Sequence, residues 1–175
     1  MIRCKIEKLN KNKHGREGFD CGLAVLNTYL QTRANQEQKK RLNVTYVATP
    51  SEENKKKSGI IGYYTLSNSS MTLSAVNPEI AKGIPPTYDI PTIKIGRLAV
   101  DKNYHHQGLG SLLLQDACLR IIELSALSGI KGVEVVAKTA AISQFYQKFG
   151  FVPLRDTPHL LFLPLETLLS AGPLR

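Results

Sequence analysis

The sequence predicts an α/β protein whose mixed sheet is flanked by helices, and two stretches carry that prediction. In residues 96–111 an apolar strand leads through a polar turn with two glycines into a long apolar helix. Farther along, residues 133–137 (VEVVA) have the composition of a buried strand. A strand, a helix and a second strand in this order imply a right-handed crossover between two parallel strands.

The first part of the chain predicts further strands and one long helical region. Residues 2–8 alternate in part between apolar and charged side chains, which is typical of a strand. Residues 21–40 place apolar side chains three and four apart, so we expect a helix with one buried face, either continuous or broken near Thr32. Residues 44–49 and 59–66 predict two strands joined by the polar loop SEENKKKS.

The second part begins with a connection, residues 67–91, that contains four prolines. Such a long irregular segment is uncommon in a compact domain unless it is functional, so we expect it to face a substrate or a second subunit. The remaining predicted elements are a central strand at 93–100, helices at 112–127 and 140–149, a last strand at 160–163 and a short helix at 165–169.

Composition sets the broad class. The chain has 175 residues, 42% of them hydrophobic and 21% charged, which suits one soluble domain spanning residues 1–175. No apolar run reaches the roughly 18 residues of a membrane span, so we expect no membrane partner. The three cysteines are widely spaced and odd in number, which favours free thiols in a reducing cytoplasm.

The positive charge is concentrated at one end of the sequence. The formal net charge is +9; residues 1–66 hold 13 basic and 6 acidic side chains, whereas residues 67–175 hold 10 and 8. This asymmetry suggests a polyanionic partner, with nucleic acid as the leading candidate, although a solvated basic face would look the same. The candidate nucleic-acid contacts are Arg33, Lys39, Lys40, Arg41 and Arg97.

The turn before the long helix is the clearest candidate binding site. Gly108 and Gly110 lie where backbone N–H groups at a helix N-terminus point outward, and such groups bind phosphate or pyrophosphate. A tight turn without a ligand is the alternative. No GxxxxGK[ST] pattern is present, and Leu113 replaces the third glycine of GxGxxG. The adjacent His105 and His106 have no metal-binding spacing, so we expect no metal site.

Two motifs in order resemble those of the GNAT N-acetyltransferases. The segment HHQGLG (105–110) is similar to the family's acyl-CoA motif, Arg/Gln-x-x-Gly-x-Gly/Ala, although His105 replaces the usual first residue. The segment SQFYQKFGF (143–151) is similar to its FYxxxGF motif. The resemblance implies a GNAT fold with splayed parallel strands, acetyl-CoA as co-substrate, and Tyr146 as the catalytic acid. It places acetyl-CoA against Leu98, Ala99, Val100, His105, His106, Gln107, Gly108, Leu109, Gly110 and Ser111.

The reaction itself sets requirements that can be compared with the sequence. An amine that attacks acetyl-CoA creates an oxyanion, which a backbone N–H near residues 98–100 would stabilise, and a thiolate, which a phenol can protonate. The pantetheine arm would pair with the same strand edge. Residues 93–97 (IKIGR) hold no carboxylate to serve as a base. An α-amine, with a pKa of about 8, needs a base less than a lysine does, with a pKa of about 10.4, and is therefore the favoured acceptor.

Most of the chain, residues 18–151, also resembles the TacT-type toxins of bacterial toxin–antitoxin operons. The similar runs include GFDCGLAVLNTYLQTRANQEQKKRL, IIGYYTLS, IPTIKIGRLAVDKNYHHQGLGS and GIKGVEVVAKTAAISQFYQKFGF. This resemblance implies acetylation of the α-amine of aminoacyl-tRNA, a block of translation, a homodimer and a ribbon-helix-helix antitoxin. The chain lacks the acidic residue that the family more often has after the second parallel strand. The alternatives are a GNAT enzyme for a protein or small-molecule amine, and a non-catalytic nucleic-acid-binding module.

Overall fold

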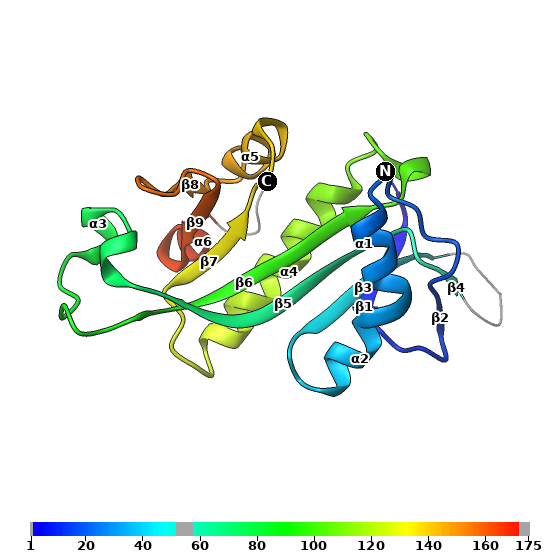
Figure 1. Ribbon diagram of the computed structural model, residues 1–175, viewed down its shortest axis with the longest axis horizontal. Helices are drawn as coiled ribbons and strands as arrows, with labels where there is room; N and C mark the ends of the chain where they lie inside the picture. Colours follow the sequence, from blue (N-terminus) through cyan, green and yellow to red (C-terminus); the bar gives the residue numbers. More distant parts are fainter. Residues whose placement is uncertain (1, 52–57, 172–175) are drawn as a thin grey trace. The chain divides into compact units, whose positions relative to one another are not determined.

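The structure is a computed structural model that describes residues 2–51 and 58–171. Figure 1 shows a seven-stranded mixed sheet in the order β1-β3-β5-β6-β7-β9-β8, and β2 (His14–Gly15) pairs separately with β4 (Ser58–Gly59). The strands of the large sheet are β1 (Cys4–Lys8), β3 (Val44–Pro50), β5 (Gly62–Met71), β6 (Ile90–Val100), β7 (Gly132–Val136), β8 (Val152–Pro153) and β9 (Leu160–Pro164). The predicted α/β class with a mixed sheet is confirmed.

The chain divides into two compact units, which are described separately. The first contains residues 1–67 and 96–117, and the second contains residues 68–95 and 118–175. The expected single domain over residues 1–175 stays a prediction. Most of the predicted loop SEENKKKS, including its three lysines, lies outside the described residues. None of the helices in the described ranges is long and apolar enough to cross a membrane.

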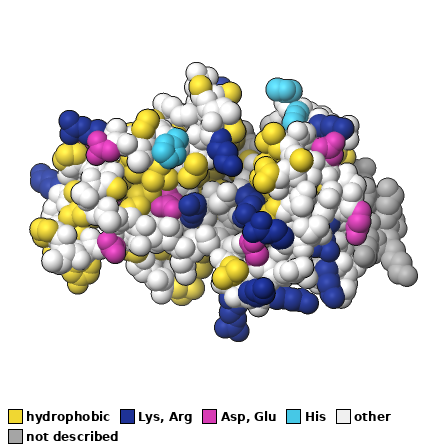
Figure 2. Space-filling view, viewed as in Figure 1, with side chains coloured by type: hydrophobic (Ala, Val, Ile, Leu, Met, Phe, Trp, Pro, Cys, Tyr) yellow, Lys and Arg dark blue, Asp and Glu magenta, His cyan; other side chains and the backbone are white. Residues whose placement is uncertain are grey.

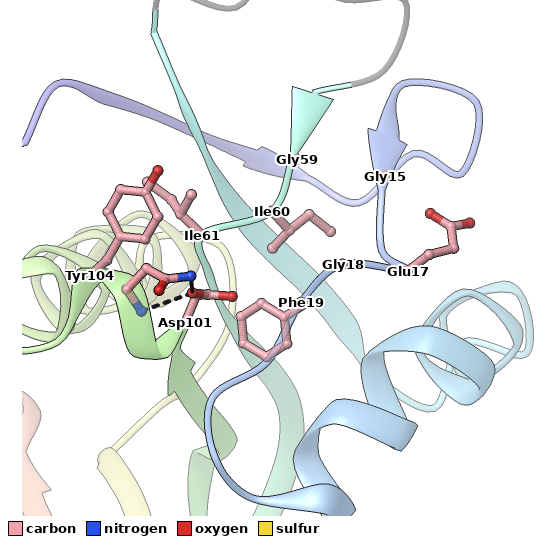
Figure 3. Close-up of a pocket in the computed structure, with 10 residues that line it drawn as sticks. Gly15, Glu17, Gly18, Phe19, Gly59, Ile60, Ile61, Asp101 and Tyr104 are labelled. Atoms are coloured by element: carbon pink, nitrogen blue, oxygen red, sulfur yellow. Dashed lines mark hydrogen bonds between the residues drawn. The ribbon is translucent and has the colours of Figure 1, made fainter.

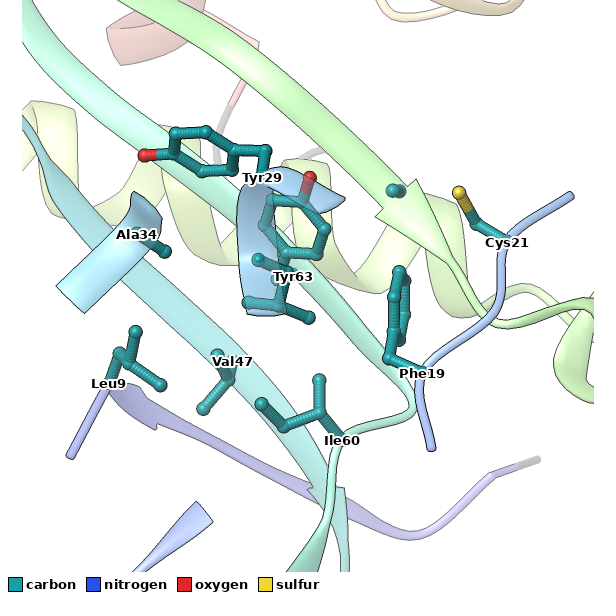
Figure 4. Packing of buried hydrophobic residues seen from close by; sticks show 10 residues of the cluster. Leu9, Phe19, Cys21, Tyr29, Ala34, Val47, Ile60 and Tyr63 are labelled. Carbon is teal, nitrogen blue, oxygen red and sulfur yellow. The ribbon is translucent and has the colours of Figure 1, made fainter. Parts of the chain in front are cut away.

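The first unit packs one long helical region on an antiparallel part of the sheet. β1 pairs with β3 and β3 with β5, and Tyr63 of β5 lies at the centre of a buried cluster. Figure 4 shows the rings of Phe19 and Tyr29 around it, with ring centroids 5.4 Å and 6.2 Å from that of Tyr63. The Tyr63 hydroxyl donates a 2.9 Å hydrogen bond to the carbonyl of Leu26, so its one polar group is satisfied.

The helix predicted at 21–40 runs without a break from Ala24 to Lys39, as the continuous alternative held, but it changes to a π-helical turn around Thr32. It consists of α1 (Ala24–Thr28), a π-helical turn (Tyr29–Arg33) and α2 (Ala34–Lys39). The hydroxyl of Thr32 donates a 2.7 Å hydrogen bond to the carbonyl of Thr28. A hydroxyl that binds the carbonyl four residues earlier competes with the helical backbone, which accounts for the irregular turn at this position.

Glu7 in β1 contacts two lysines and a buried histidine within the first unit. Its carboxylate lies 2.5 Å from the ammonium of Lys13, 3.0 Å from that of Lys5 and 3.2 Å from Nε2 of the buried His14. The hydrogen bond from Lys13, followed by those from Lys5 and His14, lowers the pKa of Glu7 from 4.5 to about 2. The cluster ties β1 to the loop that follows it.

We expect this carboxylate to make stability depend on pH in the acid range. Since the pKa of Glu7 is lower in the folded chain, its contribution is complete above pH 4.5 and is lost as the pH falls towards 2. Thermal unfolding from pH 7 to 2 should show the stability gap between wild type and Glu7→Gln narrowing only in that interval. The exposed Glu79→Gln serves as the control, and an equal gap at every pH would contradict this account.

The second unit contains the paired part of the two parallel strands that the sequence predicts. β6 and β7 pair in parallel from Thr92↔Gly132 to Ile95↔Val135, and β7 pairs antiparallel with β9. The helices α4 (Leu109–Ser125), α5 (Ala140–Gln147) and α6 (Leu165–Ala171) match predicted helices, with α4 starting earlier than expected. The hydroxyl of Thr139 accepts a 3.3 Å hydrogen bond from the N–H of Ile142 and caps α5. Beyond α5, Gly150 has φ +89°, as expected of a glycine after a helix.

The irregular segment predicted at residues 67–91 is shorter in the structure, because strands extend into both of its ends. β5 continues to Met71 and β6 begins at Ile90, with a 3₁₀ turn (Leu73–Ala75) and the short helix α3 (Pro78–Ala81) between them. Met71 and Ile90 are buried in one cluster with Leu154 and Phe162. The end of β5 could not be recognised in the sequence, because residues 67–70 (SNSS) are polar and only partly buried or exposed. Met71, which follows them, is the one fully buried residue of this part of the strand. The short strand β8 was also missed.

Candidate active site

The turn after β6 is held by a buried carboxylate. Asp101 accepts 3.0 Å hydrogen bonds from the N–H and the side-chain amide of Asn103, and another of 3.0 Å from the N–H of Asp20. The ammonium of Lys102 lies 2.7 Å from the carboxylate of Asp20. These contacts fix the 3₁₀ turn Lys102–Tyr104 and so the start of the segment predicted to bind acetyl-CoA.

The predicted acyl-CoA segment has the geometry of an anion site. The Nε2–H of His105 donates to the backbone carbonyl of Val100 at 2.8 Å. The side-chain amide of Gln107 donates to the backbone carbonyl of Asn103 at 3.0 Å. His106 and Gly108 have φ values of +59° and +82°, in the left-handed region. The side chains of His105 and Gln107 therefore bind their own turn, which leaves the backbone of the segment as the part available to a ligand.

The start of α4 supplies outward backbone donors. Its first bond of the helical type runs from the N–H of Leu112 to the carbonyl of Gly108, at 3.1 Å. The N–H groups of Leu109, Gly110 and Ser111 precede that bond and have no intrahelical acceptor by geometry. Leu109 is buried, which anchors the helix end, while residues 105–108 are exposed. This arrangement suits a phosphate or pyrophosphate group.

The strand that precedes the turn is irregular where an oxyanion donor was predicted. Tyr63 and Thr65, two apart in β5, face the same side of the sheet. A Cβ on Gly96 would lie 3.2 Å from the hydroxyl of Thr65, and Ala99 packs in the cluster around Tyr63. Positions 96 and 99 thus face one side although they are three apart, which requires a bulge between them. The bulge changes the direction of the backbone N–H groups that lead into Leu98, Ala99 and Val100.

Tyr146, the predicted catalytic acid, is a buried residue of α5. It is 6% exposed and packs edge-on against the rings of Phe145 and Phe151. Burial, and then the neighbouring Cys118, raise the pKa of its phenol above the usual 10, so the group stays protonated near neutral pH. Burial likewise raises the pKa of the Cys118 thiol to about 12. All three cysteines are free thiols, as predicted.

The sequence reasoning overlooked Glu134 on β7. Its side chain is 4% exposed and accepts hydrogen bonds from Ser69 and Thr92, at 2.8 Å and 3.2 Å. The carboxylate lies on the strand next to the central one, which itself carries no acidic residue. A charged residue in the middle of the apolar run VEVVA was the available signal.

The predicted nucleic-acid contacts form two groups in the first unit. The guanidiniums of Arg33 and Arg97 lie 5.8 Å and 3.5 Å from the centroid of the Tyr29 ring, and Arg33 also pairs with Glu37 at 2.7 Å. Lys39, Lys40 and Arg41 are exposed at the end of α2 and just beyond it. Figure 2 shows basic side chains gathered over this end of the helix.

A cavity that the sequence did not predict lies beside the Asp101 turn. Its volume is about 260 Å³. Figure 3 shows Phe19, Ile60 and Tyr104 along its wall, with Glu17 near its edge. The three glycines of the lining, Gly15, Gly18 and Gly59, leave backbone exposed there.

Comparison with known proteins decides the family. Residues 43–153 match the family model of the acetyltransferase (GNAT) domain. The chain belongs to the GNAT acetyltransferase family. As a GNAT enzyme it is an N-acetyltransferase with acetyl-CoA as its acyl donor. Among residues 2–51 and 58–171, no group of three or more His, Cys, Asp or Glu side chains could hold a metal ion.

Two curated proteins similar to this acetyltransferase are named as toxins. It is 28% identical over 172 residues to the probable toxin TacT of Sinorhizobium fredii, covering 94% of this chain and 93% of that one. It is 30% identical over 105 residues to the tRNA-acetylating toxin of Mycobacterium tuberculosis, and the match covers 59% of this chain and 62% of that one.

Solved structures extend the similarity over nearly the whole chain. A tyrosine-to-phenylalanine mutant of KacT superposes with a TM-score of 0.89 at 28% identity, covering 97% of this acetyltransferase and 99% of KacT. AtaT complexed with acetyl-methionyl-tRNAfMet gives a TM-score of 0.86 at 29% identity, and the match covers 94% of this chain and 96% of AtaT. The GNAT fold expected from the motifs is confirmed.

Proposed function

We propose that this acetyltransferase is a toxin that transfers the acetyl group of acetyl-CoA to the α-amine of aminoacyl-tRNA and so blocks translation. The observation that carries the proposal is the similarity to AtaT, whose structure contains acetyl-methionyl-tRNAfMet, over 94% of the chain. The name of the mycobacterial relative, tRNA-acetylating toxin, points the same way. The basic first part of the chain and the central strand without a carboxylate are independent support.

The residue roles in this proposal come from the family resemblance, and the geometry of each part supports them. The backbone of His105–Ser111 binds the pyrophosphate of acetyl-CoA. The backbone around Leu98–Val100, past the bulge, pairs with pantetheine and donates to the oxyanion. As the C–S bond breaks, the phenol of Tyr146 gives its proton to the leaving thiolate, because the raised pKa keeps that proton in place.

The proposed partners are an antitoxin and a second copy of the chain, in the cytoplasm. Neighbouring structures include AtaT bound to the C-terminus of the antitoxin AtaR, and a complex of KacTA with DNA. We propose a ribbon-helix-helix antitoxin and a homodimer on the strength of the family resemblance. Size-exclusion chromatography with light scattering, with and without the co-expressed antitoxin, tests both.

The experiment that tests the function is acetyl transfer from labelled acetyl-CoA to a pool of charged tRNA. Uncharged tRNA and a lysine-rich protein mixture are the controls. Label on charged tRNA alone supports the proposal, and the labelled amino acid defines the specificity. Label on protein, or on no acceptor, refutes it.

We expect the basic end of α2 to contribute to tRNA affinity through phosphate contacts. A variant with Lys39→Gln, Lys40→Gln and Arg41→Asn should bind tRNA more weakly and with a shallower dependence on salt. Each lost phosphate contact lowers the slope of log K against log salt by about 0.9 for duplex regions. Asparagine is chosen at position 41 because Arg41 has φ +59°.

The control for this variant is Lys82→Gln, which removes an exposed lysine from the second unit. Filter binding at several salt concentrations measures the slopes. An unchanged slope in the triple variant, or an equal change in Lys82→Gln, would contradict a specific role for the end of α2.

A further inference from the structure

Arg97 of β6 rests on an aromatic ring of the helical region in the first unit. Its guanidinium carbon lies 3.5 Å from the centroid of the Tyr29 ring, a separation at which the planar guanidinium stacks on the ring face. The ring is itself held in place, because it stacks on Tyr63 with centroids 6.2 Å apart (Figure 4) and its hydroxyl donates a 3.2 Å hydrogen bond to Asn43. Arg97 therefore lies on a fixed platform.

The chain supplies no counter-charge to this guanidinium. Glu37, the carboxylate near the same ring, is already used: Oε1 accepts a 2.7 Å hydrogen bond from Arg33, and Oε2 accepts one of 2.7 Å from Asn43. In the part of the chain that the structure describes, Arg97 forms no ion pair and donates no hydrogen bond. A half-buried cation has lost part of its hydration, so this position favours an anionic ligand.

Arg97 lies beside the backbone proposed to hold the acetyl group. It directly precedes the segment Leu98–Val100, and it shares its side of the sheet with Ala99, which packs in the same buried cluster as Tyr29. Since a strand rises about 3.3 Å per residue, an anion at Arg97 would lie on the order of 10 Å from this backbone. The turn proposed to bind pyrophosphate, His105–Ser111, begins only beyond the end of β6, so the two anions are different.

We propose that Arg97 binds the phosphodiester that precedes the terminal adenosine of tRNA and so places the aminoacyl group at the acetyl carbon, an inference that rests on the proposed function. In aminoacyl-tRNA, only the ribose of that adenosine and the ester linkage separate this phosphate from the amino acid. Stacking occupies the face of the guanidinium and leaves the N–H groups along its edge, which match two oxygens of a phosphate. Arg97 is a substrate-binding residue and takes no proton in the reaction.

The test measures binding of an acceptor-stem minihelix that ends in CCA, with its last linkage either a phosphodiester or an uncharged methylphosphonate. We expect the uncharged linkage to weaken binding to wild type by on the order of tenfold. Arg97→Gln should bind the two minihelices equally. Arg97→Lys keeps the charge but loses the planar fork, so it should keep only part of the preference.

The matched control is Arg33→Gln, because the Arg33 guanidinium lies over the same ring, 5.8 Å from its centroid, but is paired with Glu37. The ratio between the two minihelices is the readout, and Arg33→Gln should keep the full ratio of wild type. A preference that survives in Arg97→Gln, or one that is lost equally in Arg33→Gln, would overturn the phosphate contact.

Acetyl-CoA affinity, melting temperature and acetyl transfer to charged tRNA are measured in parallel. A loss of acetyl-CoA affinity in Arg97→Gln at an unchanged melting temperature would assign the anion to the co-substrate and overturn the inference. If wild type acetylates charged tRNA but binds both minihelices equally, the inference fails and the proposed function stands. If wild type acetylates no charged tRNA, the proposed function fails and the inference falls with it.

Discussion

Tyr146→Phe should slow acetyl transfer by about 10²–10⁴-fold and leave acetyl-CoA binding unchanged. The substitution removes one oxygen, and the phenylalanine ring can keep the edge-on contacts with Phe145 and Phe151. Loss of a general acid typically costs 10²–10⁴-fold, so kcat should fall by about that factor. Because burial raises the pKa of this phenol above 10, its ionisation should cause no loss of activity below pH 10.

The matched control for this change is Tyr88→Phe, which removes a hydroxyl from an exposed tyrosine in the same unit. Titration calorimetry measures acetyl-CoA affinity and the labelled assay measures turnover. A Tyr146→Phe protein with wild-type turnover would favour a non-catalytic module on the GNAT fold. A protein that has lost acetyl-CoA binding would assign Tyr146 to the binding of the co-substrate.

The features predicted from the sequence are those with a local pattern. The turn at His105–Ser111 and the FY pair of α5 stand in short motifs, and the irregular turn around Thr32 involves a hydroxyl that acts within one helical turn. The Glu134 cluster has no such pattern because Ser69, Thr92 and Glu134 come from three strands and meet only after these strands pair. The bulge in β6 is hidden for a similar reason, since it shows only against the neighbouring β5.

The extent of β5 shows a second limit of the sequence. The run SNSS has low strand propensity, and the strand extends through it because Met71 beyond it is buried with Ile90 and Leu154. Tertiary packing thus overrode the local preference. The same extension brings Ser69 to Glu134, so the segment that the sequence assigned to a loop contributes to the buried polar cluster on β7.

Gly132→Ala should destabilise the protein by about 3 kcal/mol or more, the cost of a steric overlap that the core cannot relieve. A Cβ at this position would lie 2.5 Å from the carbonyl oxygen of Leu163 and would also overlap the ring of Phe162. The carbonyl belongs to the backbone of β9, which is paired with β7 and cannot turn aside as a side chain could. Gly129→Ala is the control, since its Cβ meets no atom within 4 Å, and urea unfolding measures both variants. Equal stability of the two would contradict the overlap, whereas the expected difference would show that β7, and with it Glu134, is held in place by a position that only glycine can occupy.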